Sequence, residues 1–100
     1  MEADAIAVPF ASRSSSLLIA SGFGRLSGWN IWESAGSPAA AQVRFRDGTT
    51  SGGTIIGGAK LAASGTDPGM NMDEGVRFTT GIYMEVVAGS VEGVVYIRSD

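Results

Sequence analysis

The chain has 100 residues, of which 44% are hydrophobic and 17% are charged, a composition typical of one small globular domain. Its formal net charge is −3, so it lacks the excess of lysine and arginine that would neutralise phosphates, and nucleic acid is not an expected partner. Histidine and cysteine are absent, which excludes disulfides, most zinc sites and nucleophilic catalysis by thiol or imidazole. The acidic start MEADAIAVPF is unlike a secretory signal, no apolar run approaches a membrane span, and no membrane association is expected.

Residues 1–16 differ in composition from the rest of the chain and end in the polar run SRSSS. Such a segment is either a mobile tail or an extended arm that pairs with a neighbouring chain. The arm is favoured by the alternation of Ile6, Val8 and Phe10 with smaller residues. We therefore expect an extended or flexible N-terminal arm over residues 1–16 and a folded domain over residues 17–100.

The folded part has the features of an all-β domain. The chain contains 15 glycines and short runs rich in Val, Ile and Tyr, with turn signals about every 8–12 residues and no convincing helical period. The predicted fold is a single antiparallel β-sandwich, jelly-roll-like, with the extended N-terminal arm. Strands are expected at about 17–23, 25–33, 41–47, 53–62, 70–72, 75–79, 81–88 and 91–98.

The stretch GIYMEVVAGSVEGVVYIRSD at the end of the chain predicts a β-hairpin with Gly89-Ser90 as a two-residue type II′ turn. In this register, one face is entirely apolar apart from glycine and is assigned to the core: Ile82, Met84, Val86, Val95 and Ile97. The opposite face pairs Val87 with Glu92, Glu85 with Val94, and Tyr83 with Tyr96. Either these Tyr and Val pairs stabilise the sheet itself or another chain covers the face.

Residues 28–46 predict a second hairpin, in which Trp29 lies opposite Phe45. The tripeptide Ala-Gly-Ser occurs in both hairpin turns, at 35–37 and 88–90. The repetition suggests two equivalent corners of a sandwich.

Trp29 and Trp32 lie three residues apart in a predicted strand, so their side chains point to opposite faces. Trp32 is the better surface candidate because polar side chains share its face in the predicted hairpin: Asn30, Gln42 and Arg44. An exposed tryptophan with such neighbours suits a protein interface or stacking on a sugar. Burial in the core is the alternative.

Few residues suggest chemistry. A local group of oxygen ligands is formed by Asp67, Asn71, Asp73 and Glu74. Its spacing does not match a calcium-binding loop, and we interpret it as a solvated loop. Glu85 and Glu92 share a face of the last predicted hairpin, where they keep that face soluble rather than hydrolyse a glycoside. We expect no enzyme activity, no cofactor and no metal.

Three strings of this sequence resemble small virion structural proteins of tailed bacteriophages: GRLSGWNIWESAGSPAAAQVRFRDGT, LAASGTDPGMNM and GIYMEVVAGSVEGVVYI. The shared order is a Gly-Trp strand, an acidic residue, a small-residue corner with an Ala run, Arg-Asp-Gly-Thr, a Leu-Ala-Ala segment and a closing Gly- and Val-rich hairpin. The resemblance covers about residues 24–98. It implies a β-sandwich that is built many times into the head, the head–tail connection or the tail, and it carries no catalytic residues.

We therefore expect a phage virion structural protein, a capsid decoration or minor head protein, which is assembled in the bacterial host cytoplasm and located in the virion. Its expected partners are further copies of itself, as a dimer or trimer, and the major capsid protein or other virion proteins. The alternative is a carbohydrate- or receptor-binding module of a phage tail or fibre that uses Trp32, Tyr83 or Tyr96 to stack on sugar. The residues expected at an interface are Phe10, Trp32, Tyr83, Val87, Val94 and Tyr96.

Overall fold

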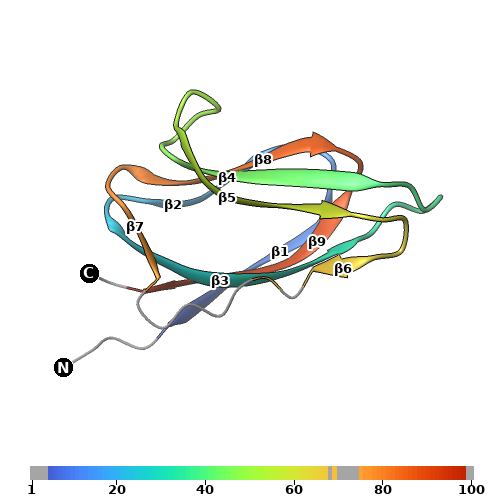
Figure 1. Ribbon diagram of the computed structural model, residues 1–100, viewed down its shortest axis with the longest axis horizontal. Helices are drawn as coiled ribbons and strands as arrows, with labels where there is room; N and C mark the ends of the chain where they lie inside the picture. The colour runs from blue at the N-terminus through green and yellow to red at the C-terminus, as the bar shows by residue number, and fades with distance from the viewer. Residues whose placement is uncertain (1–4, 68, 70–74, 99–100) are drawn as a thin grey trace.

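The computed structural model describes residues 5–67, 69 and 75–98, and these residues form nine strands and no helix. The strands make two antiparallel sheets that pack face to face, which confirms the predicted all-β sandwich (Figure 1). The strands are β1 (Ile6–Arg13), β2 (Leu17–Ser21), β3 (Gly24–Glu33), β4 (Ala41–Asp47), β5 (Thr54–Leu61), β6 (Thr66–Asp67), β7 (Val76–Phe78), β8 (Gly81–Ala88) and β9 (Val91–Arg98). The strand expected at 70–72 lies outside the described residues.

The strand order is that of a jelly roll. One sheet, called sheet A, has the order β1-β9-β3-β6, and β7 also pairs with β3; the other, sheet B, has the order β2-β8-β4-β5. Therefore β1 pairs with β9, β2 with β8, β3 with both β6 and β7, and β4 with β5. These pairs alternate between the two sheets, which is how a long folded-back chain wraps into a jelly roll.

The two hairpins predicted from the sequence are not formed. β8 lies in sheet B and β9 in sheet A, and in the same way β3 lies in sheet A and β4 in sheet B. The reason is that β9 has β1 and β3 as neighbours, whereas β8 has β2 and β4, so strands that are adjacent in sequence face one another across the core. Tyr83 and Tyr96 are consequently not a cross-strand pair. Trp29 and Phe45 do meet, but across the core, with ring centroids 4.8 Å apart.

Both Ala-Gly-Ser tripeptides lie where the chain crosses from one sheet to the other, as the repetition suggested. The crossings are packed together, because the Ser34 N–H donates to the Ser90 carbonyl oxygen at 3.0 Å. Gly89 has a φ of +74°, and a Cβ on it would lie 2.6 Å from the Ala40 carbonyl oxygen. A left-handed backbone and this close approach together require glycine at the corner.

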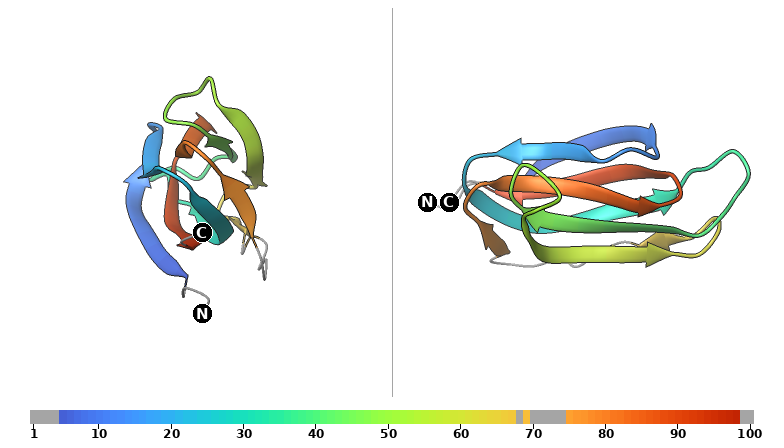
Figure 2. Two further views of the ribbon diagram at one scale, coloured as in Figure 1. Left: turned by 90° about the vertical axis from the view of Figure 1, so that its left-hand side faces the viewer. Right: turned by 90° about the horizontal axis from the view of Figure 1, so that it is seen from above.

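The alternation of residues within each strand correctly predicts which side chains of β8 and β9 point into the core, although the hairpin predicted between the two strands is not formed. Ile82, Met84 and Val95 are fully buried, and Val86 and Ile97 pack against the core. The core lies between the two sheets. Figure 2 shows the sheets end-on in one view and looks down onto sheet B in the other. Because the side-chain period of a strand is two, the sequence determines which residues point inward even where the partner strand is unknown.

The N-terminal segment is extended, and residues 6–13 form β1, which pairs with β9 of the same chain. Phe10 lies opposite Gly93 of β9 and is only 7% exposed. Phe10 is thus a core residue and not part of an interface. Within the described residues, Ile6–Arg13 are therefore an extended strand that pairs within the chain's own sandwich.

Two carboxylates hold loops at opposite ends of the sandwich. Glu33, at the end of β3, accepts hydrogen bonds from the N–H groups of Ser64 at 2.7 Å and Ala35 at 2.6 Å. Asp47, at the end of β4, accepts from the N–H groups of Thr80 and Thr79, each at 3.0 Å. These donors favour the charged form, so the Ser64 N–H above all lowers the pKa of Glu33, and the Thr80 N–H above all lowers that of Asp47.

We expect the free energy of unfolding to decrease as the pH falls below about 4. Both carboxyls have lowered pKa values in the folded chain, so their stabilising effect is complete above the unfolded-state pKa and is lost as the pH falls through the folded-state value. Thermal unfolding followed by circular dichroism checks this. The Glu33→Gln, Asp47→Asn double variant should melt at a lower temperature near neutral pH and lose less on acidification than the wild type. Equal slopes for the two proteins contradict the assignment.

Candidate interaction surface

The remaining interface candidates are divided between the two outer faces of the sandwich. Trp32, Val94 and Tyr96 point outward from sheet A, whereas Tyr83 and Val87 point outward from sheet B. The continuous Tyr- and Val-rich face predicted from the last hairpin therefore does not exist. The structure splits it in two because β8 and β9 belong to different sheets.

The outward side chains of β1, β9 and β3 make what we call the sheet A face. Its middle is largely apolar: Val94 and Tyr96 are half-buried and Pro9 is exposed, with Asn30 as the polar side chain there, and Trp32 is 36% exposed at one end of β3. Tyr96 has only small neighbours in its row. The two central rows across β1, β9 and β3 are Ala7–Tyr96–Gly28 and Pro9–Val94–Asn30.

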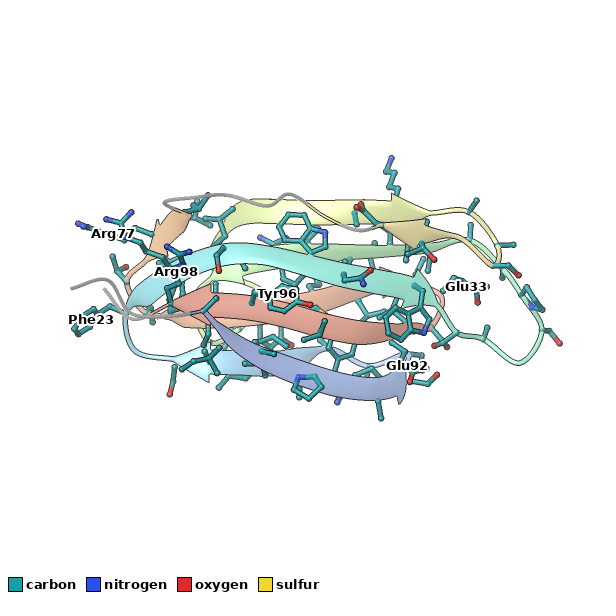
Figure 3. All side chains as sticks on the ribbon, turned by 90° about the horizontal axis from the view of Figure 1, so that it is seen from below. Phe23, Glu33, Arg77, Glu92, Tyr96 and Arg98 are labelled. Atoms are coloured by element: carbon teal, nitrogen blue, oxygen red, sulfur yellow. The ribbon has the colours of Figure 1, made fainter. Side chains whose placement is uncertain are left out.

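Charges of opposite sign lie at the two ends of this face. At one end, Arg98 of β9 lies opposite Arg25 of β3, and Arg25 lies opposite Arg77 of β7. The three arginines therefore form one row across the sheet. At the other end Glu92 lies beside Trp32. Figure 3 shows Tyr96 between the arginine end and the glutamate end. Along β9 the separation of Glu92 from Arg98 is about 20 Å, at about 3.3 Å per residue.

The outer face of sheet B has the opposite arrangement, because charges occupy its centre. The Glu85 carboxylate lies 3.0 Å from Arg46 Nε and 3.8 Å from Arg44 Nη1. Arg46 also donates to the Gly53 carbonyl oxygen at 2.8 Å. The exposed apolar side chains of this sheet lie on its edge strands β2 and β5 and close to a corner: Leu18, Ile55 and Val87.

The described edge strands are protected against pairing with another chain. β1, β2 and β5 each contain a register shift, and β1 also contains Pro9, which has no N–H to donate. β6 and β7 have two and three residues. Short, bulged or proline-containing edges are the usual means of preventing sheet-to-sheet growth. The described edges are therefore poor sites for strand pairing with another chain.

The polar set proposed for sugar binding is not assembled. Asn30 shares the sheet A face with Trp32, but Gln42 and Arg44 of β4 point outward from sheet B. The prediction was wrong because it placed β3 and β4 in one hairpin. Trp29 is core and Trp32 is surface, as expected, with exposures of 5% and 36%.

A cavity of about 360 Å³ lies where β5 approaches β6 and β7. A Cβ on Gly57 would lie 3.1 Å from the Trp29 ring, so glycine allows β5 to approach the indole. The indole Nε1 is buried without a hydrogen-bond partner, and Asp67 accepts from the Gly69 N–H at 2.6 Å. The described residues that line it include one carboxylate and no basic side chain: Trp29, Ile56, Gly57, Gly58, Asp67, Gly69 and Val76.

Other kinds of site find little support in the part of the chain that the structure describes. It contains no group of three or more acidic, His or Cys side chains that would hold a metal ion. Asn71, Asp73 and Glu74 of the predicted oxygen cluster lie outside the described residues. Among residues 5–67, 69 and 75–98 there is also no helix with the length and apolar character needed to cross a membrane.

One exposed aromatic residue was missed by the sequence reasoning. Phe23 lies in the turn between β2 and β3 and is 71% exposed. Figure 3 shows it at the arginine end of the molecule. The signal was the string Gly-Phe-Gly, because a turn between glycines ordinarily carries a polar residue.

Comparison of the chain with protein-family models, with curated proteins and with solved structures finds no match. The structural features that bear on function are therefore those of the chain itself. They are a jelly-roll sandwich with protected edge strands, a largely apolar outer face on sheet A and a charged centre on the outer face of sheet B.

Proposed function

We propose that this chain is a phage virion structural protein, a capsid decoration or minor head protein, which acts by binding in many copies and catalyses no reaction. The observation that carries the proposal is the largely apolar sheet A face, with Tyr96 and Val94 in its middle and Trp32 at one end, on a domain whose described edge strands are protected against pairing. Tyrosine and tryptophan are the residues that most often dominate protein interfaces.

The jelly-roll order supports the proposal by analogy of fold, since viral capsid domains use it, although lectin domains do so too. The resemblance of residues 24–98 to phage virion proteins points to the first of these classes. The dispersal of Gln42 and Arg44 away from Trp32 removes the polar set on which a lectin-like site depended.

Binding in many copies is consistent with the modest apolar area of the sheet A face and with the protected edge strands. A small contact that is weak in solution becomes strong when many copies bind to one shell, because each bound copy raises the effective concentration of the next contact. At such a density an open strand edge would promote uncontrolled sheet growth. The proposed partners are other copies of this chain and the major capsid protein or other virion proteins.

Quantitative mass spectrometry of purified particles of the phage that encodes the chain tests the proposal. On the order of hundreds of copies per particle is expected for a shell protein, whereas about three to twelve would place it at a vertex, connector or tail. Absence from the particle overturns the proposal. A glycan array separates the alternative, because a shell protein should show no specific binding to sugars.

A further inference from the structure

We propose that the cavity between β5 and the strands β6 and β7 binds a small uncharged primary carboxamide. The carbonyl oxygen of the ligand accepts a hydrogen bond from the Trp29 indole, and its amino group donates one to Asp67. The cavity volume of about 360 Å³ is at the small end of the roughly 300–1,000 Å³ range of ligand pockets. This site goes beyond the proposed virion role and does not depend on it.

The first polar group of the cavity is the indole N–H of Trp29. This residue is 5% exposed, and its Nε1 is buried without a hydrogen-bond partner among the described residues. A Cβ on Gly57 would lie 3.1 Å from Cη2, at the far end of the ring, whereas a Cβ on Gly69 would lie 2.8 Å from Cδ1, the carbon next to Nε1. Both glycines line the cavity, so the indole forms one wall with its N–H edge on the Gly69 side.

The second polar group is the Asp67 carboxylate. Asp67 lies opposite Ile31 in the register of β3 and β6, and directly opposite residues of a sheet point to the same side. Ile31 is fully buried, so Asp67 is directed to the inner side of sheet A, as is Trp29 two residues earlier on β3. Such diagonal neighbours are roughly 7–8 Å apart. One carboxylate oxygen accepts from the Gly69 N–H at 2.6 Å, and a carboxylate can accept further hydrogen bonds.

These two groups together select the chemistry of the ligand. An ammonium group would suit Asp67 but has no acceptor for the indole N–H. An anion would accept from the indole but would face the negative Asp67, and no basic side chain is among the described residues that line the cavity. A hydrocarbon would leave the buried donor unpaired. A primary carboxamide carries an acceptor and donors on separate atoms, so it reaches farther between the two groups than a single hydroxyl does.

The rest of the described lining suits an apolar body on the ligand. It consists of two aliphatic residues and three glycines, which have no side chains to fill the space: Ile56, Gly57, Gly58, Gly69 and Val76. Ligand pockets commonly combine such apolar walls with a few placed polar groups. Benzamide, an amide on one small apolar ring, is therefore a suitable probe. Because it has few atoms, we expect a dissociation constant on the order of millimolar.

Nitrogen–proton correlation NMR of the isotope-labelled chain tests the site, because its two tryptophans give two indole N–H signals. Benzamide should shift the Trp29 signal and leave that of Trp32, which points outward from sheet A, unchanged. Toluene and benzoate are probes of similar shape. Toluene, which has no acceptor, should bind about tenfold more weakly or less than that. Benzoate, which is negative, should not shift the Trp29 signal.

Two variants test the named groups. Asp67→Asn removes the negative charge but keeps an oxygen for the Gly69 N–H, so benzoate should now bind within about tenfold of benzamide. Glu92→Gln is the matched control, since it removes the same charge from the outer face of sheet A and should still exclude benzoate. Trp29→Phe keeps a ring without the donor and should weaken benzamide binding about tenfold. If a circular-dichroism melt shows that Trp29→Phe is unfolded, the Asp67→Asn comparison decides.

Several results would overturn the proposal. If benzamide leaves the Trp29 signal unchanged up to its solubility limit, the cavity holds only solvent. If benzylamine, benzyl alcohol or benzoate binds the wild type as tightly as benzamide, the carboxamide class is wrong. Continued exclusion of benzoate by Asp67→Asn would mean that the carboxylate does not select the ligand. The proposed virion role is measured separately on purified particles, so either proposal can fail while the other stands.

Discussion

Replacing Phe45 with alanine is expected to lower the free energy of unfolding by about 3–5 kcal/mol. Phe45 is fully buried in β4, and its ring lies 4.8 Å from that of Trp29 in the opposite sheet. The variant loses the burial of the ring and leaves a cavity between the two sheets, where the neighbouring side chains are fixed by their strands. Since a domain of this size is stable by about 5–15 kcal/mol, this is a large part of the total.

Urea unfolding followed by tryptophan fluorescence measures the change, because Trp29 reports on the affected region. Val87→Ala is the matched control: Val87 is 41% exposed at the end of β8, and its truncation should change the free energy of unfolding by no more than about 0.5 kcal/mol. Similar unfolding midpoints for the two variants would show that β3 and β4 do not pack together through this ring pair.

The positions of the strands and the direction of their side chains could be predicted from the sequence. Glycine and proline mark where strands end, and alternation marks which side chains are inward, so Met84 and Val95 were correctly assigned to the core. The pairing of the strands could not be predicted in the same way. A two-residue connection at Gly89-Ser90 is equally short for a hairpin and for a crossing between sheets, and the choice depends on β1 and β3, which are remote in sequence.

The same limitation explains the errors at the candidate surface. Ile6, Val8 and Phe10 were recognised as an alternating set, but their complement, the inward row of β9 with Gly93, is at the other end of the chain. The sequence therefore predicts a strand here without identifying its partner strand in the same chain. Likewise, Trp32 was correctly placed on the surface, while the polar residues thought to accompany it lie on the other sheet.

Separating the two tyrosines gives the fold a functional consequence. In the predicted hairpin, Tyr83 and Tyr96 would be a cross-strand pair, so substituting either one would also remove a contact of the other. In the jelly roll they lie on opposite outer faces, in different surroundings. Tyr83 is level with Arg46, which pairs with Glu85, whereas Tyr96 lies between Ala7 and Gly28. The first tyrosine borders a charged centre, and the second is itself the centre of an apolar face.

On the proposal that copies of this chain bind one another through the sheet A face, Tyr96→Ser is expected to raise the dissociation constant for self-association by about 30-fold, whereas Tyr83→Ser should leave that constant unchanged. Both tyrosines are half-buried outward residues of central strands, so the two variants should lose similar amounts of folding stability. Sedimentation equilibrium measures association, and thermal unfolding of the same samples measures stability. Equal association of the two variants would mean that the sheet A face is not the self-contact. A selective loss in Tyr96→Ser, with matched melting temperatures, would assign the excess apolar surface of β9 to binding a second copy rather than to stabilising the domain.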